Sequence, residues 1–411
     1  MTATAGVRRQ PPVFDIDHVI DTRQIIVCCG SGGVGKTTTA AALALRAAER
    51  GRRVVVLTID PARRLAQALG LSELDDVPAL VDGAGKNGGE LHAMMLDMKR
   101  TFDEIVLTHA APDKAKQILE NPFYQSLSGS LAGTQEYMAM EKLGQLHAAG
   151  TWDLIVVDTP PTRSALDFLD APERVSSFLE GRMMRMLLVP AKMGGRAYLK
   201  VFSAGIGIFT AILTKITGAD LLRDVSSFLA ASESTFGGFR QRAQQTYELL
   251  KDEETAFVVV ATPEPAALRE AAYFVERLTS ERMPLAGLVV NRVHRTDEPR
   301  LTAERAIAGA ETLEERGIEP VARAALLVHA DRVRIAARDR QEIIGFVGTA
   351  PRVPVAEIAA LATDVHDLAG LRVIGAALAT DASAAQRPAA AKKSAPDGRA
   401  AAGGKPTTSG K

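Results

Sequence analysis

The ten residues GSGGVGKTTT (30–39) constrain the fold of this chain more than any other stretch. They follow the short apolar run QIIVCC (24–29) and open the alanine-rich run TTTAAALALRAAERG (37–51). The first run predicts a buried strand, and the second predicts a helix. A glycine-rich loop between them can turn its backbone N–H groups toward an anion, and the helix N-terminus adds partial positive charge. The sequence therefore predicts a phosphate-binding loop.

Residues 30–37 also match the pattern G-x-x-x-x-G-K-[ST] in full. In such a loop Lys36 neutralises the β- and γ-phosphates, the Thr37 hydroxyl ligates Mg²⁺, and Thr38 is placed to bond the α-phosphate. The predicted nucleotide-binding residues are Gly30, Ser31, Gly32, Gly33, Val34, Gly35, Lys36, Thr37 and Thr38. We therefore expect a nucleotide phosphate chain and Mg²⁺ at this loop; the alternative is a glycine-rich turn without a ligand.

Apolar, β-branched runs alternate with longer helical patterns along much of the chain. Further strands are expected at 53–60, 91–97, 152–159, 256–262 and 285–293. This alternation predicts an α/β fold with a doubly wound, mostly parallel sheet. Residues 99–150 and 163–250 break the alternation with helical patterns. We expect them to form one helical subdomain over the sheet edge that holds the nucleotide.

The composition indicates where the folded part of the chain begins and ends and which classes of partner are expected. We predict an N-terminal extension at 1–20, a P-loop domain at 21–379 that includes the helical subdomain, and a disordered Ala/Pro/Lys-rich tail at 380–411. Lys plus Arg and Asp plus Glu both number 49, so no global field favours nucleic acid. No stretch has the apolar length of a membrane span. The only two cysteines are adjacent, which indicates a reducing compartment, and we expect a cytoplasmic protein.

Three stretches together resemble the ArsA family of nucleotidases, which belongs to the SIMIBI class. They are GSGGVGKTTTAA, TIDPARRLAQALG and VVDTPPTRSALDFL, and the first is similar to the deviant P-loop K-G-G-x-G-K-[ST]. The family includes arsenite-pump ATPases and the targeting factor for tail-anchored membrane proteins. The resemblance covers roughly residues 24–70, 150–170 and 255–330. It implies an Mg²⁺-dependent ATPase that acts as a nucleotide-gated dimer.

The resemblance also implies roles for four residues outside the loop. Asp60 matches the switch I aspartate that positions the attacking water, and Asp158 matches the switch II aspartate that holds Mg²⁺. Asn291 matches an asparagine whose amide reads the adenine edge, and Glu264 fits a step that lies near the nucleotide across the dimer. Ordinary alternatives exist: a strand-end or capping aspartate, and an asparagine that bonds its own loop.

The chain lacks the sets of cysteines that bind arsenite or zinc in members of the family. An arsenite pump needs three thiolates, whereas this chain has only Cys28 and Cys29, which should point to opposite faces of a strand. The C-x-x-C zinc motif of the targeting factor is also missing. Arsenite transport is therefore not expected.

Ser31 is a further departure, because relatives carry a lysine there that reaches the partner's phosphates in the dimer. Serine has no charge to supply in trans. We favour a heterodimer with a lysine-bearing homologous ATPase over a homodimer. The alternative is a homodimer in which Ser31 slows turnover or another basic residue substitutes.

The insertion at 163–250 holds methionines 183, 184, 186 and 193, followed by an apolar stretch to Ile216. Flexible methionines suit a surface for varied hydrophobic clients, and the resemblance implies a client groove for a membrane protein. The alternative is that residues 180–240 are subdomain core or dimer interface.

Two other function classes are compatible with the motifs. One is a catalytically weak regulatory subunit of a heterodimeric ATPase, which Ser31 also supports. The other is a ParA/MinD-like positioning ATPase, which predicts a basic patch or an amphipathic C-terminal helix.

Overall fold

The computed structural model describes residues 14–59, 64–127, 134–159, 224, 227–228, 241–296, 298 and 300–386. Asp60, the methionine-rich segment 183–216 and the tail beyond residue 386 lie outside these residues. The predictions made for them therefore remain predictions.

Within the described ranges, eight strands form one sheet in the order β3-β4-β2-β5-β1-β6-β7-β8. The strands are β1 (Ile25–Cys29), β2 (Arg53–Thr58), β3 (Ala79–Leu80), β4 (Glu90–Met95), β5 (Leu154–Asp158), β6 (Thr255–Ala261), β7 (Leu285–Val293) and β8 (Val355–Ala359). All neighbouring pairs are parallel except β3–β4. The predicted doubly wound, mostly parallel sheet is confirmed. All six predicted strands are present, whereas β3 and β8 were not predicted.

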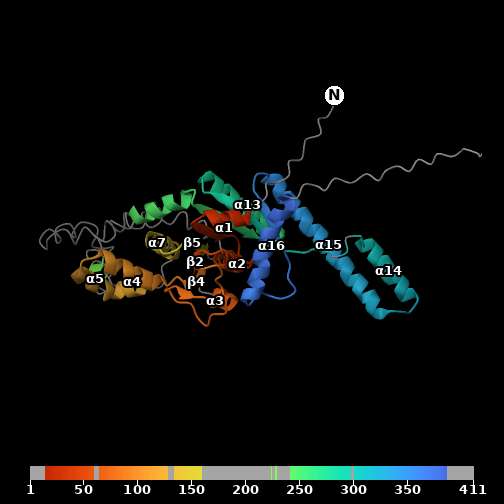
Figure 1. Ribbon diagram of the computed structural model, residues 1–411, viewed down its shortest axis with the longest axis horizontal. Coiled ribbons are helices and arrows are strands. Elements are labelled where there is room, and N and C mark those ends of the chain that lie inside the picture. Colours follow the sequence, from red (N-terminus) through yellow and green to blue (C-terminus); the bar gives the residue numbers. More distant parts are fainter. Residues whose placement is uncertain are drawn as a thin grey trace, which may run out of the picture.

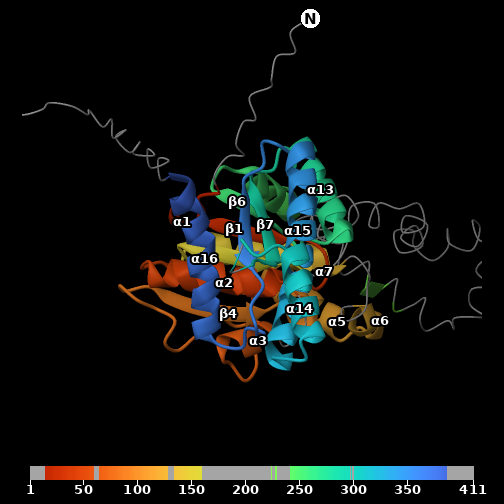
Figure 2. The ribbon, with the colours of Figure 1, turned by 90° about the vertical axis from the view of Figure 1, so that its right-hand side faces the viewer.

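Helices cover both faces of this sheet (Figures 1 and 2). Helix α2 (Lys36–Glu49) packs on the central strands and carries α1 (Ile16–Thr22), α3 (Arg64–Leu69) and α16 (Leu368–Gln386). Helix α13 (Pro265–Ser280) packs on β6 and β7. Right-handed crossovers place α2 and α13 on opposite faces, because the chain moves along the sheet in opposite directions through them. Burial on both faces explains why β1, β5 and β6 are apolar at nearly every position.

Two helices extend across predicted domain boundaries. The predicted extension at 1–20 contains the start of α1, whose Ile16 and Ile20 are fully buried in the core. Seven residues give too short a period to stand out in the sequence, although Ile16, Val19 and Ile20 lie on one helical face. At the other end, α16 continues to Gln386, past the residue at which the tail was predicted to begin.

Residues 98–148 contain the expected helices, namely α4 (Met98–His109), α5 (Pro112–Leu119), α6 (Pro122–Leu127) and α7 (Thr134–Ala148). Of the second predicted helical segment, 163–250, residues 224, 227–228 and 241–250 are described and are helical. The two segments touch: Arg242 Nε donates to Glu141 at 2.8 Å, and Asn121 Nδ2 donates to the Asp224 carbonyl at 2.9 Å. These contacts support one helical subdomain. None of the helices in the described ranges has the length and apolar character needed to cross a membrane.

A helical hairpin follows β7 and was not predicted. Helix α14 (Ala303–Glu315) and the 30-residue α15 (Pro320–Thr349) lie side by side (Figure 2). The C-terminal part of α15 joins the core through Ile343 and Phe346. Its N-terminal part and α14 project from the body on the side opposite α4 and α5 (Figure 1).

Candidate functional site

The predicted phosphate loop links the end of β1 to the start of α2 and packs tightly against two other strands. Gly30 has φ 146°, and a Cβ there would lie 2.1 Å from the Val260 carbonyl oxygen of β6. Gly35 has φ 97°, and a Cβ there would lie 2.2 Å from Nδ2 of Asn291. Only glycine fits such positions, because it tolerates positive φ and has no side chain. The glycines therefore let the loop close down on the sheet.

The start of α2 is open to an anion. Its first turn contains no acidic residue, and Gly35, the residue before it, provides no side-chain cap. The first N–H groups of a helix lack intrahelical partners and favour negative charge. Lys36 begins the helix, is 6% exposed, and donates from Nζ to the Ser31 carbonyl at 2.8 Å. The ammonium group thus folds back over the loop.

Three oxygen-bearing side chains meet beside the loop. The Asp158 carboxylate at the end of β5 is fully buried, and its Oδ2 accepts from Thr37 Oγ1 at 2.8 Å and from Thr58 Oγ1 at 3.0 Å. They converge because β5 lies between β1 and β2 and the carboxyl ends of parallel strands share one edge. Carboxylate and hydroxyl oxygens are suitable ligands for Mg²⁺. Thr58 was not predicted, although its place at a strand end, two residues before Asp60, was a usable signal.

The last described residue before Asp60 is held by the helical subdomain. Gln135 Nε2, on α7, donates to the Ile59 carbonyl at 2.8 Å. This bond joins α7 directly to the segment that contains the predicted switch I aspartate. Sequence reasoning missed Gln135, because nothing in its local pattern distinguishes it from a solvated helix residue.

Asn291 lies against the loop and bonds backbone groups. Its Nδ2 donates to the Val34 carbonyl at 2.9 Å, and its Oδ1 accepts from the Arg292 N–H at 2.9 Å. Arg292 has φ 60°, an uncommon left-handed conformation that this bond supports. The described contacts are those of the ordinary alternative, in which Asn291 braces its own surroundings. The adenine role stays a prediction.

The other predicted site residues are more exposed to solvent. Thr38 is half-buried in the first turn of α2, and Gly32 and Gly33 are exposed at the loop. Glu264 is exposed immediately before α13 and makes no capping bond. Its predicted contact across a dimer stays a prediction.

Cys28 and Cys29 are both buried in β1. Burial raises the pKa of both thiols, and that of Cys29 reaches about 12. Neutral, enclosed thiols in a central strand do not form an accessible thiolate pair.

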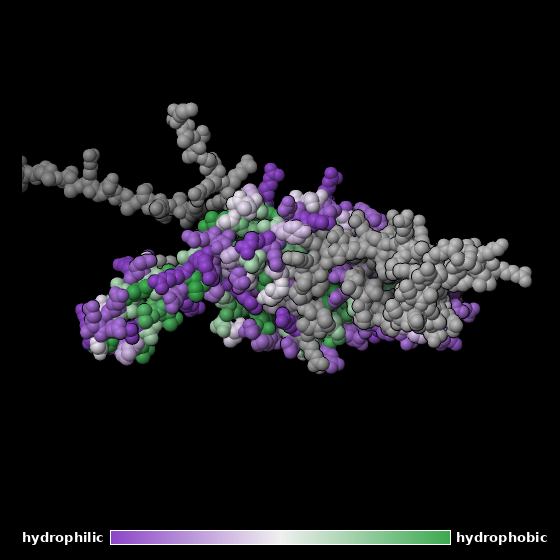
Figure 3. All heavy atoms as spheres, turned by 180° about the vertical axis from the view of Figure 1, so that it is seen from behind, coloured by the Kyte–Doolittle hydropathy of each residue, from purple (hydrophilic) through white to green (hydrophobic). Residues whose placement is uncertain are grey.

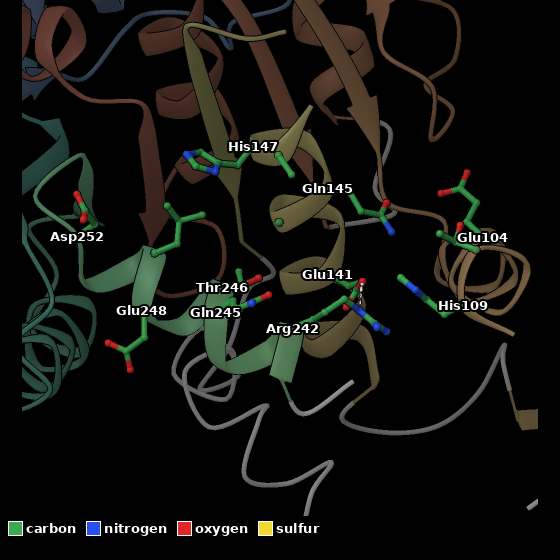
Figure 4. A pocket seen from close by; sticks show the side chains of 14 residues that line it. Glu104, His109, Glu141, Gln145, His147, Arg242, Gln245, Thr246, Glu248 and Asp252 are labelled. Carbon is green, nitrogen blue, oxygen red and sulfur yellow. Dashed lines mark hydrogen bonds and ion pairs between the residues drawn. The ribbon is translucent and has the colours of Figure 1, made fainter. Parts of the chain in front are cut away.

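A cavity of about 710 Å³ lies away from the phosphate loop, between α4, α7 and residues 241–252. Charged and polar residues line it, but most of its exposed wall area is apolar. Figure 4 shows Arg242 reaching Glu141 across it, with His109 on the α4 side and His147 on α7. Its lining residues come from these segments and not from the phosphate loop.

A glycine-rich strand-to-helix loop, a buried lysine and a strand-end aspartate on a doubly wound parallel sheet define a P-loop nucleotidase. The family model described as anion-transporting ATPase matches residues 23–314, so the chain belongs to the ArsA-type anion-transporting ATPases. It is an ATPase of that family.

Several relatives align with this chain over about two thirds of its length. ATPase ARSA2 of Chlamydomonas reinhardtii is 28% identical over 287 residues, which are 68% of this chain and 70% of the relative. The ATPase ASNA1 homolog of Cryptosporidium parvum is 28% identical over 67% of this chain and 66% of its own. ATPase GET3 of Malassezia globosa is 27% identical over 71% and 79%, respectively.

Proposed function

We propose that this ATPase depends on Mg²⁺ and works as a nucleotide-gated dimeric switch that couples hydrolysis to a protein or membrane-associated partner. The observation that carries the proposal is the convergence of Lys36, Thr37 and Asp158 at one end of the sheet beside an open helix N-terminus. Phosphoryl transfer needs positioning and charge neutralisation more than a strong base, and this arrangement is suited to both.

Each residue has a distinct task in the proposed reaction. Loop N–H groups and the start of α2 bind the phosphates, and Lys36 exchanges its bond to the Ser31 carbonyl for the β- and γ-phosphates. Thr37 and Asp158 hold Mg²⁺. The bound ion neutralises charge on the phosphate oxygens.

The attacking water is assigned to Asp60, which follows the end of β2 by two residues in the sequence. Thr38 bonds the α-phosphate. In this proposal Asn291 is the adenine-proximal residue and Glu264 approaches the nucleotide from across the dimer.

Ser31 shapes the proposed assembly. Its backbone carbonyl accepts from Lys36, and its hydroxyl carries no charge that could reach a second nucleotide. We favour a heterodimer in which a homologous subunit supplies a lysine at this position. A catalytically weak regulatory subunit is the second candidate, since the same residue supports it. The family match favours either over a ParA/MinD-like positioning ATPase.

The partner is assigned from the sequence of the helical insertion. Its methionines and apolar residues suit a hydrophobic or membrane-protein client, and a cytoplasmic location fits such a role. Relatives named ATPase GET3 and ATPase ASNA1 homolog support the choice of family, not the identity of a client.

The direct test compares ATP turnover and solution mass of wild type and Ser31→Lys, each with ATP and Mg²⁺. We expect wild type alone to be slow and to gain no mass when ATP is added, whereas Ser31→Lys should gain mass with ATP and turn over faster. Equal turnover by wild type, together with an ATP-dependent gain in its mass, would show that the trans lysine is dispensable and remove the case for a heterodimer.

A further inference from the structure

The projecting hairpin formed by α14 and the first part of α15, residues 301–340, is called the arm. Its two helices meet through small side chains, Ala303, Ala306 and Ala330, with Leu301, Leu326 and Val333 around them. A two-helix layer has only this one internal seam. Its remaining faces are therefore open to other chains.

An apolar stripe runs along one open face. Val321 is 80% exposed and Val328 is 60% exposed, two turns further along α15. Leu327, which is 38% exposed, lies about 100° around the helix from Val328, and Ile318, which is 47% exposed, lies in the turn before α15. Figure 3 shows hydrophobic residues along the arm between hydrophilic ones. Single exposed apolar residues are ordinary, but two aligned valines on a projecting element, with two more exposed apolar residues beside them, suit an interaction surface.

The two helices of the arm carry opposite charge. Helix α14 bears four glutamates and one arginine, and the part of α15 in the arm bears five arginines and two aspartates. The glutamates are residues 304, 311, 314 and 315, and the arginines of α15 are residues 323, 332, 334, 338 and 340. An acidic helix beside a basic one makes the arm complementary to an antiparallel copy of itself.

The arm is held firmly at its base. Asp339 is 1% exposed, and its Oδ2 accepts from the His294 N–H at 3.1 Å and lies 2.8 Å from His294 Nδ1. His329 Nε2 lies 2.9 Å from the Leu301 carbonyl oxygen. These contacts fix α15 to the segment between β7 and α14. A preorganised arm loses little conformational freedom when it binds.

We propose that the arm joins two copies of this chain. The two arms lie antiparallel, with α14 of each against α15 of the other, so that the stripe around Val321 and Val328 is covered and the opposite charges face each other. This contact is isologous and closes with two copies. All of α15 lies outside the matched family region 23–314. The contact is additional to the dimer proposed at the nucleotide site.

The first test measures the solution mass of the full chain without nucleotide. We expect wild type to form a reversible dimer. The dissociation constant of the dimer should rise at least about tenfold when Val321→Glu and Val328→Glu are combined, because a buried charge without a partner opposes the contact. Leu107→Glu is the control, since Leu107 is 62% exposed on α4 at the opposite end of the molecule. A monomeric wild type, or a stripe variant that associates as wild type does, overturns the proposal.

The second test uses charge reversal and does not depend on the stripe. One variant carries Glu311→Arg and Glu315→Arg, and the other carries Arg332→Glu and Arg340→Glu. All four residues are exposed, which limits the effect on folding. Each variant alone should be monomeric, and an equal mixture should form a mixed dimer. Failure of the mixture to associate while each variant remains folded contradicts the arrangement.

Lys36→Ala separates this proposal from the proposed ATP-driven dimer. The variant should lose ATP turnover and keep the nucleotide-free arm dimer. Loss of the arm dimer in Lys36→Ala would contradict an arm contact that is independent of the nucleotide site.

Discussion

Asp158 is the residue on which the candidate site depends most. Its buried carboxylate joins hydroxyls from α2 and from β2, so a single side chain connects the phosphate loop with the strand that leads to Asp60. Removing its charge should leave the packing intact, because asparagine has nearly the same shape.

We therefore expect Asp158→Asn to lower ATP turnover by about a hundredfold and to raise the Mg²⁺ concentration needed for half-maximal rate. The control is Asp153→Asn, just before the opposite end of the same strand, where Asp153 Oδ2 accepts from the Arg53 N–H. Steady-state rates over a range of Mg²⁺ measure both effects. An unchanged Mg²⁺ requirement would show that Asp158 has no part in holding the ion.

Asn291 offers a choice between two roles that nucleotide selectivity can separate. Because its amide braces the Val34 carbonyl, Asn291→Ala should weaken binding of ATP and GTP by a similar factor, about tenfold. Titration with both nucleotides gives the two dissociation constants. Loss of ATP affinity alone would instead assign Asn291 to the adenine edge.

The cysteines give a pH-dependent prediction. Burial raises the pKa of both thiols, and that of Cys29 to about 12, so neither forms thiolate in the folded chain at pH 8. A thiol reagent at pH 8 should modify neither residue in the native protein and both after denaturation. Rapid modification of the native chain would show that β1 opens.

At the scale of the element, sequence patterns were informative where burial is complete. The strands β1, β5 and β6 are buried along their whole length and appear as continuous apolar runs. Edge strand β8 alternates between buried and half-buried residues over five positions, which is too short a signal. Helix α15 was missed because much of it contacts solvent, so its apolar residues follow no single buried stripe.

The site residues divide in a similar way, into those that belong to a local motif and those that only the packing brings to the site. Lys36, Thr37 and Asp158 lie in local motifs, and each takes its place from the strand or helix that carries the motif. Thr58 and Gln135 reach the site through the order of the sheet and the packing of α7. Pairing between strands distant in sequence is not encoded in any local period, so these two residues required the structure.

Helix α1 is fastened to α2 by an ion pair that can be tested by stability measurements. Arg46 Nε and Nη2 bond the two Asp17 carboxylate oxygens at 2.5 and 2.7 Å, and hydrogen bonding from Arg46 lowers the pKa of Asp17. This contribution is present above the ordinary aspartate pKa and is lost as the pH falls through the lowered value. Asp17→Asn should reduce the free energy of unfolding by about 1 kcal/mol at pH 7.

Denaturant unfolding at pH 7 and at pH 3 measures the effect, and the difference between wild type and Asp17→Asn should shrink at the lower pH. Asp113→Asn, in the first turn of α5, is a control away from this pair. An equal loss at both pH values would mean that the charge of Asp17 does not fasten α1.

For the whole molecule, the order of the strands places the nucleotide. The chain leaves β1 toward β2 on one side and reaches β6 and β7 on the other, so the helices α2 and α13 diverge above the end of β1. Ligands of open parallel sheets bind in the crevice that such a reversal creates. The phosphate loop lies at this reversal, with the helical subdomain on one side and the arm on the other (Figure 1).

The most direct measurement is Mg²⁺-dependent ATP turnover by the purified chain and by Lys36→Ala, with Lys116→Ala as the control on the exposed face of α5. The proposed site predicts that Lys36→Ala loses at least about a hundredfold of the wild-type rate, because the buried ammonium is needed to neutralise the β- and γ-phosphates. The rate of Lys116→Ala should be unchanged. Turnover by Lys36→Ala at the wild-type rate would contradict the assignment of hydrolysis to this loop.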